Sequence, residues 1–303
     1  MGNISENERK SIMTTINILV VTDKNYIPLT NVLLTSLFDN NTQCTIVVHL
    51  MHSSLTDEDL IEIRQVVEKN SGTLQSYQVK AEHINTTMDE SNQGRLPEET
   101  YYRLLCMSYL PVELDRVLYL DCDIIINGSL EELYNTDLTN YLFAAAYDFI
   151  EAMSDVSEDI KKLKNNVVQY MTPGCKYVNA GVLLINLAKL REVLTTEKIV
   201  SMIDEIKGIL VHRDQDFLNF VFGEQICYVD YKLYNYFPLY WHWDEVKTGQ
   251  PVIFHFAGRI RPWKDGYFEM LEPYIEAYRG KTRLFVKQAK ELYEHYKAMS
   301  LQT

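Results

Sequence analysis

The sequence is poor in the residues that mark fibrous, low-complexity or disordered chains. Its 303 residues include only 12 glycines and 8 prolines, while 47% are hydrophobic and 12% are aromatic. This composition excludes a collagen-like or disordered chain, because so many apolar residues can bury a large core. At roughly 150 residues per domain, the length predicts one large domain, or one domain with a small appendage.

Long hydrophobic runs are also missing. Apolar runs such as Val182–Ile185 are far shorter than the ~20 residues that a membrane-spanning helix needs. The opening residues, MGNISENERK, have no apolar stretch after their charges and do not resemble a signal peptide. We therefore expect a soluble, cytoplasmic protein.

Paired cysteines and basic clusters are scarce as well. The five cysteines are odd in number and have no CxxC spacing, which argues against a disulfide framework and a zinc site. Residues 1–150 hold 9 Lys and Arg against 22 Asp and Glu, whereas residues 151–303 hold 20 of each. An acidic half argues against nucleic acid as the partner. A phosphate-bearing small molecule is still compatible, because a bound cation can reverse the local field.

The sequence does contain an alternation of apolar strands and amphipathic helices. The predicted strands are Ile16–Thr22, Cys44–Met51, Thr73–Val79, Arg116–Leu120, Tyr141–Tyr147 and Val178–Leu187, with two short late strands, ICYVD and VIFHF. Helical spacing appears between them, as at Leu29–Phe38 and Asp214–Phe222. This pattern predicts an α/β fold with a mostly parallel central sheet flanked by helices.

Polar residues at strand ends are the first place to look for a site, because ligands of such sheets bind beyond the carboxyl ends of the strands. The residues that qualify are Asp23, Asn25, Asp121, Asp123, Asp148 and, in a late strand, His255. Asp121 and Asp123 are the strongest signal. Their carboxylates can converge while Cys122 faces away, and converging anions repel unless a cation such as Mg²⁺ or Mn²⁺ lies between them. The alternative is a solvated acidic turn.

Other motifs surround this pair in a fixed order: VTDKNYIP, ETYYRL, RVLYLDCDII, VNAGVLLINL, DQDFLN and HFAGRIRPW. Together they resemble glycosyltransferase family 8, which includes bacterial lipooligosaccharide galactosyltransferases and glycogenin. The resemblance runs from about Ile16 to Trp263. It implies a GT-A-type nucleotide-binding domain over residues 16–266, a helical tail over 267–303, and disorder in residues 1–15.

The resemblance also implies roles for individual residues. Asp121, Asp123 and His255 match the ligands of Mn²⁺, for which Mg²⁺ is an alternative. The positions that match donor-binding residues for a UDP-hexose are Asp23, Asn25, Tyr26, Arg103, Asp121, Cys122, Asn179, Ala180, Gly258 and Arg261. Those that match the catalytic region around the donor hexose are Gln215, Asp148 and Asp214. The family usually has Lys where this chain has Arg261, and Arg keeps the positive charge and can bind phosphate bidentately.

Each of these residues also has a structural interpretation. His255 could be a buried core histidine, and Asp23 could cap a strand-to-helix turn. Arg103 could form a salt bridge, and Asp214 could serve as a favourable charge at a helix N-terminus. Without the resemblance, both kinds of interpretation stay open.

The implied activity is a retaining, Mn²⁺-dependent transfer of galactose or glucose from a UDP-sugar to a glycan or glycolipid acceptor. Gln215 is a poor nucleophile, so we expect departure and attack on the same face, with a carboxylate nucleophile, Asp148 or Asp214, as the alternative. The alternative functions are a glycogenin-like self-glucosylating protein and a catalytically silent sugar-nucleotide binder.

Five segments have further expected roles. Asn92–Pro97 and Ala257–Pro262 are candidate lids, and the acceptor is expected at residues 157–176 and 234–244. The tail from Tyr274 holds six basic residues against three acids. It could rest weakly on an anionic membrane at the inner face of the cell membrane, or pack back on the domain, and we favour packing.

Overall fold

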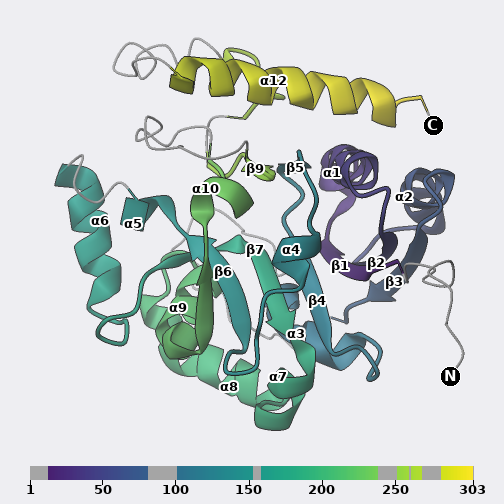
Figure 1. Cartoon of the computed structure of the whole chain (residues 1–303). Coiled ribbons are helices and arrows are strands. Elements are labelled where there is room, and N and C mark those ends of the chain that lie inside the picture. The colour runs from purple at the N-terminus through teal and green to yellow at the C-terminus, as the bar shows by residue number, and fades with distance from the viewer. Residues whose placement is uncertain are drawn as a thin grey trace, which may run out of the picture.

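The computed structural model describes residues 13–80, 101–152, 158–237, 251–258, 261–267 and 281–302. A seven-stranded sheet with the order β3-β2-β1-β4-β7-β6-β8 forms its centre (Figure 1). These strands are β1 (Thr15–Val21), β2 (Thr45–His52), β3 (Thr73–Gln78), β4 (Arg116–Leu120), β6 (Phe143–Tyr147), β7 (Val178–Asn186) and β8 (Ile226–Val229). The predicted α/β fold with a mostly parallel sheet is confirmed.

One strand runs against the others. β1 pairs in parallel with β2 and β4, and β6 with β8, but β7 is antiparallel to both β4 and β6. A separate two-stranded ladder joins β5 (Ile124–Ile126) to β9 (Ile253–His255). This ladder brings a late segment of the chain next to the end of β4.

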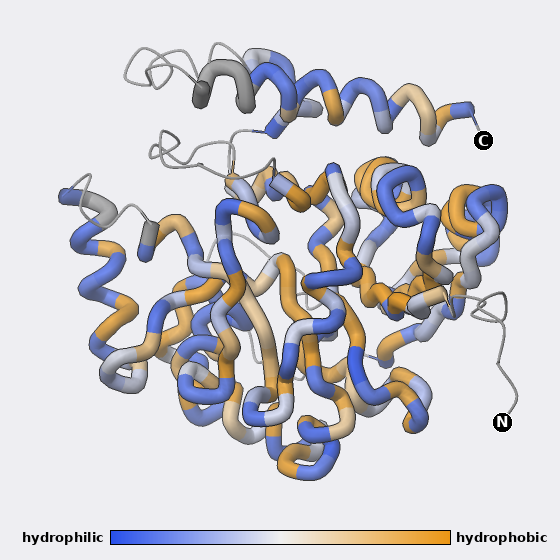
Figure 2. Tube along the Cα trace, in the orientation of Figure 1, coloured by the Kyte–Doolittle hydropathy of each residue, from blue (hydrophilic) through white to orange (hydrophobic). Residues whose placement is uncertain are grey.

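Two hydrophobic cores lie on opposite faces of the sheet, because successive strand residues point to opposite sides. Ile18 and Val20 belong to the core that also includes residues of α1 (Ile27–Asn40) and α2 (Asp57–Lys69), whereas Leu19 belongs to the other. That second core packs α3 (Tyr102–Tyr109), α7 (Leu187–Val193), α8 (Thr196–Ile206) and α9 (Asp214–Phe222). Figure 2 shows hydrophobic residues along the central strands and hydrophilic ones on the outer turns of the helices.

The smaller elements follow local sequence signals. Thr56 and Asp59 form a capping box at the start of α2. The remaining short helices are η2 (Lys24–Tyr26), α4 (Glu131–Tyr134), α5 (Phe149–Ala152), η5 (Lys207–Ile209), η6 (Gly223–Gln225) and α10 (Tyr231–Tyr234). The polar segment after residue 157 contains α6 (Glu158–Val168). In the described ranges, no helix is long and apolar enough to cross a membrane.

The C-terminal helix α12 (Lys281–Ser300) packs on α1, as the packing interpretation expects. The hydroxyl of Tyr296 accepts a hydrogen bond from Nδ2 of Asn40 at 2.7 Å and donates to Oδ2 of Asp39 at 3.1 Å. Tyr293 is buried beside Trp263, with ring centroids 5.5 Å apart. The candidate lid Asn92–Pro97, residues 259–260 of the second candidate lid and residues 238–244 of the acceptor segment lie outside the described residues.

Candidate functional site

The antiparallel direction of β7 determines which residues meet at the site. Because β7 runs against β4, its first residues lie beside the last residues of β4, with Leu120 opposite Val182. The backbone N–H of Asp121 donates to the carbonyl of Gly181 at 2.8 Å. Asn179 and Ala180 therefore reach the same sheet edge as Asp121, although they start their strand rather than end it.

Asp121, Asp123 and His255 form a compact cluster whose ligand atoms all lie within 4.8 Å of one another. Nε2 of His255 is 3.2 Å from Oδ1 of Asp123 and 3.8 Å from Oδ2 of Asp121. The β5–β9 ladder produces this arrangement, because it places His255 opposite Ile124.

The cluster has the properties of a divalent-cation site. His255 is 1% exposed, and within the described part of the chain its Nε2 has no hydrogen-bond partner. Two carboxylates and an imidazole form a ligand set that suits Mn²⁺ better than Mg²⁺, which prefers oxygen ligands. Gly181 has no Cβ, and this leaves the space that the His255 ring occupies. A Cβ at residue 181 would lie only 2.4 Å from Cε1 of His255.

Cys122 faces away from this cluster, as predicted. Its thiol donates to the carbonyl of Val21 at 3.2 Å and accepts from the Thr30 hydroxyl at 3.3 Å. Burial raises the pKa of the thiol to about 12, so it stays protonated. If Cys122 contacts a UDP-sugar, we expect that contact to come from its backbone.

Arg103 is buried between two carboxylates. It lies 3.2 Å from Oδ1 of Asp121 and 3.0 Å from Oδ2 of Asp214, and it donates to the carbonyl of Ala180 at 2.6 Å. Burial raises the pKa of Asp214 to about 6, although the charge of Arg103 acts in the opposite direction. The salt-bridge interpretation of Arg103 thus holds, and it brings Asp214 to the site.

A hydrogen-bonded group beside the cluster joins the other predicted residues. Oε1 of Gln215 accepts from Nδ2 of Asn179 at 3.0 Å and from the backbone N–H of Ala180 at 3.1 Å. Oδ2 of Asp148 accepts from Asn179 at 3.1 Å and from Gln215 at 3.3 Å. Burial raises the pKa of Asp148. These side chains present fixed donors and acceptors of the kind that sugar hydroxyls bind.

A strained loop forms one wall of the site. Arg213 has a φ of +49°, a left-handed conformation that is uncommon outside glycine. Asp216 holds this loop, because its Oδ2 accepts from the backbone N–H groups of Val211 and His212 at 2.7 and 2.6 Å. Its Oδ1 accepts from the Tyr177 hydroxyl at 2.5 Å. Asp216 therefore anchors the loop.

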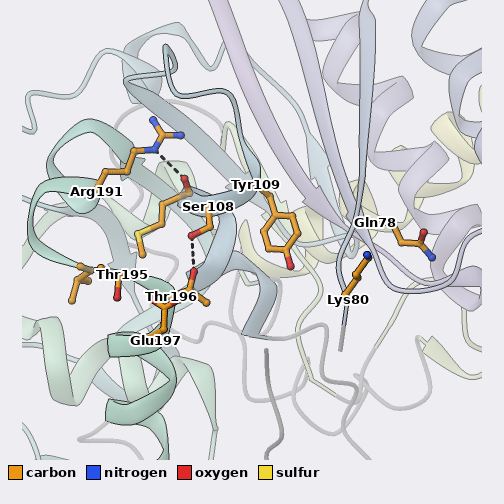
Figure 3. A pocket seen from close by; sticks show the side chains of 10 residues that line it. Gln78, Lys80, Ser108, Tyr109, Arg191, Thr195, Thr196 and Glu197 are labelled. Atoms are coloured by element: carbon orange, nitrogen blue, oxygen red, sulfur yellow. Dashed lines mark hydrogen bonds between the residues drawn. The ribbon is translucent and has the colours of Figure 1, made fainter. Parts of the chain in front are cut away.

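A pocket of about 220 Å³ opens at this place. It is lined by Arg103, Asp121, Ala180, Gly181 and residues 211–215. A larger pocket of about 570 Å³ lies at the other end of α3, between Lys80 and Tyr109 on one side and Thr196 on the other (Figure 3). None of the predicted site residues lines it, so we assign the candidate site to the smaller pocket.

The end of β1 and the residue after His255 lie beside the turn of Asp121 and Asp123. The thiol of Cys122 bonds the carbonyl of Val21, and the N–H of Phe256 donates to the carbonyl of Asp123. Oδ1 of Asp23 accepts from the backbone N–H groups of Asn25 and Tyr26 at 2.6 and 3.2 Å, which is the capping role. Gly258 has a φ of +97°, and Nε of Arg261 donates to its carbonyl at 2.8 Å.

Two residues of the site were missed by sequence reasoning. The Tyr119 hydroxyl donates to Oδ1 of Asp121, and the guanidinium of Arg103 lies 4.3 Å from the centre of the Tyr119 ring. Oδ1 of Asn235 lies 2.7 Å from Nδ1 of His255. Tyr119 occupies an ordinary strand position and Asn235 a loop with no motif, so neither carried a recognisable signal.

Comparison with known proteins gives consistent matches. The family model of glycosyl transferase family 8 matches residues 17–266. A lipopolysaccharide 1,2-glucosyltransferase of Escherichia coli is 27% identical over 261 residues, which cover 83% of this chain and 74% of that protein. A lipopolysaccharide 1,3-galactosyltransferase of Salmonella typhimurium is 25% identical, covering 86% and 77%. The crystal structure of galactosyltransferase LgtC with donor and acceptor sugar analogues superposes with a TM-score of 0.69 at 25% identity, covering 86% of this chain and 95% of LgtC.

Proposed function

This chain belongs to glycosyl transferase family 8, and we propose that it transfers galactose or glucose from a UDP-sugar to a glycan or glycolipid acceptor. The observation that carries this proposal is the Asp121–Asp123–His255 cluster beside the small polar pocket. Relatives that act on lipopolysaccharide support a lipid-linked glycan as the acceptor class.

In this proposal Asp121, Asp123 and His255 hold a divalent cation, and Mn²⁺ suits the mixed ligand set. When bound, the metal would offset the negative charge that develops on the departing diphosphate. Arg261 adds a second positive charge for the phosphates. Gly258 would let the backbone come close to them, because it has no Cβ and open space lies beside it. A Cβ there would meet no described atom within 4 Å.

The sugar would lie against Asp148, Asn179 and Gln215. Both ends of the Gln215 amide are hydrogen bonded, so its oxygen is oriented but is a poor nucleophile. Asp214 is paired with Arg103, and Asp148 accepts from the backbone N–H of Ile150 at 3.0 Å. Because each group is engaged in this way, we favour a mechanism in which UDP departs from the same face of the sugar that the acceptor attacks. This retains the anomeric configuration, with Gln215 as a polar stabiliser.

The test is to measure UDP release from UDP-galactose and UDP-glucose, with Mn²⁺ or with EDTA, before any acceptor is known. We expect slow, Mn²⁺-dependent release from one of the two donors, because a competent site hydrolyses its donor slowly. No release from either donor would favour a silent sugar-nucleotide binder. Added hexose in the intact mass would instead indicate self-glucosylation.

The acceptor class requires a second experiment. Incubation with radiolabelled donor and a panel of lipid-linked and free oligosaccharides should give a labelled lipid-linked product. Labelling of free oligosaccharides alone would contradict the lipid-linked class while leaving the transferase activity intact.

We further propose a cytoplasmic location, with at most weak contact at the inner face of the membrane.

A further inference from the structure

Asn235 is fully buried. It connects the Asp121–Asp123–His255 cluster to the hydrogen-bonded group of Asp148, Asn179 and Gln215. Its Oδ1 lies 2.7 Å from Nδ1 of His255, and its Nδ2 donates to Oδ1 of Asn179 at 3.0 Å. We propose that Asn235 is a positioning residue that holds His255 in the tautomer whose Nε2 lone pair faces the two aspartates. This inference rests on the proposed metal-dependent function.

One backbone group determines the direction of these hydrogen bonds. The N–H of Gly181 donates to Oδ1 of Asn179 at 2.9 Å, and a backbone N–H cannot act as an acceptor. The Asn179 atom at this position is therefore its oxygen, and the Asn235 atom that faces it is the NH₂ group. The oxygen of Asn235 then faces His255, so Nδ1 of His255 must carry the proton.

The opposite end of the chain of amides agrees with this direction. Nδ2 of Asn179 donates to Oδ2 of Asp148 at 3.1 Å and to Oε1 of Gln215 at 3.0 Å. The backbone N–H of Ala180 also donates to that Gln215 oxygen, which fixes it as an acceptor. A flip of Asn179 would turn its oxygen to the acceptors of Asp148 and Gln215 and its NH₂ group to the N–H of Gly181. A flip of Asn235 would turn its oxygen to the oxygen of Asn179.

The consequence concerns Nε2 of His255. With the proton on Nδ1, Nε2 directs a lone pair at Asp123 and Asp121, whose oxygens are 3.2 and 3.8 Å away. The Nε2 lone pair and the two carboxylate oxygens are all hydrogen-bond acceptors, and they repel one another unless a cation lies between them. Histidine ligands of metals commonly donate their other ring N–H to such a partner, and removing that partner typically lowers metal affinity ~10–100-fold.

The first test compares the Mn²⁺ affinity of Asn235→Leu with that of the wild type, measured from the electron paramagnetic resonance signal of free Mn²⁺. We expect a loss of about tenfold or more. The matched control is Asn41→Leu. Asn41 is also buried, and its side chain bonds the backbone of Leu37 and Leu130, neither of which belongs to the cluster. This control should lose stability but keep the wild-type Mn²⁺ affinity.

Asn235→Asp keeps an oxygen that accepts from Nδ1 of His255, although its second oxygen then faces Oδ1 of Asn179. We therefore expect a smaller loss of Mn²⁺ affinity than in Asn235→Leu. Equal losses in Asn235→Asp and Asn235→Leu would overturn the proposal, as would no loss in Asn235→Leu. The metal-free wild type gives a direct test that does not depend on the folding of an Asn235 variant. Its ¹⁵N spectrum should show the His255 ring, assigned with His255→Gln, protonated at Nδ1, and protonation at Nε2 alone would overturn the proposal.

His255→Gln separates this inference from the proposed function. If that variant binds Mn²⁺ as tightly as the wild type, the proposed metal site itself is wrong. If it loses affinity while Asn235→Leu does not, only the role of Asn235 is wrong.

Discussion

At the residue scale, Asp123 is the simplest place to test the site. Asp123→Asn removes one negative charge with little change in volume, so we expect transfer to fall by at least about 100-fold while the melting temperature stays close to wild type. Asp204→Asn, on the exposed face of α8, is the matched control and should keep full activity. Near-normal activity of Asp123→Asn in Mn²⁺ would show that the metal site is wrongly assigned.

Gly181 tests the same site through space instead of charge. A Cβ at residue 181 would lie 2.4 Å from Cε1 of His255 and 2.6 Å from Oδ2 of Asp121. We expect Gly181→Ala to weaken Mn²⁺ binding about tenfold, because both ligands must move. Gly208→Ala is the control, since a Cβ there meets no described atom within 4 Å. Calorimetric titration with Mn²⁺ measures both, and equal affinities would contradict the expectation.

These residues also show how far the sequence could predict the site. Asp121 and Asp123 were predicted because a strand and a DxD spacing are local features. Asn235 was not, because its role depends on a ladder that joins residues more than a hundred positions apart. Its sequence neighbourhood differs little from that of an ordinary loop.

At the element scale, the strands were predicted from their apolar composition, but two features of their arrangement were not. The three-residue strand β5 is too short to show a period. The reversed direction of β7 is set by its partners, since a buried strand has the same composition in either direction. That reversal brings Asn179 to the sheet edge where Asp121 follows the last residue of β4.

Helix α12 supports the HFAGRIRPW segment. Nζ of Lys290 donates to the carbonyl of Pro262 and lies about 6 Å from the rings of Tyr267 and Tyr293. We expect Lys290→Met to lower the free energy of unfolding by about 1 kcal/mol, because the side chain is only partly buried. We also expect it to raise KM for the UDP-sugar about threefold with little change in kcat, since the loop of Arg261 would loosen.

The control for this variant is Lys287→Met. Lys287 lies on the same helix and pairs only with exposed Glu291 among the described residues. Urea unfolding and steady-state kinetics of both variants provide the measurement. A KM increase of the same size in Lys287→Met would attribute the effect to lost positive charge on α12 instead of to support of the loop.

At the scale of the whole molecule, charge opposes donor binding. The net charge is −13, all of it contributed by residues 1–150. The UDP-sugar that we propose as the donor carries a diphosphate. We therefore expect UDP to raise the melting temperature only when Mn²⁺ is present, with about 2.7 kcal/mol of stabilisation at a hundredfold excess over Kd. Thermal scans with UDP, with Mn²⁺ and with both provide the test. An equal shift by UDP in EDTA would show that the cation is not required for binding.

Membrane contact is the last property that depends on the whole molecule. An amphipathic membrane helix needs its aromatic residues on the lipid side, but Tyr293 and Tyr296 are buried against α1 and the loop of Trp263. The tail from Tyr274 then offers a net charge of only +3 spread over 30 residues. That is weak beside the roughly four to eight clustered cations that recognise anionic lipids. We expect the protein to stay in the supernatant when it is sedimented with anionic liposomes at about 150 mM salt, where charges are screened beyond about 8 Å. Sedimentation that persists at this salt and is lost when residues 274–303 are removed would show instead that α12 leaves α1 to bind the membrane.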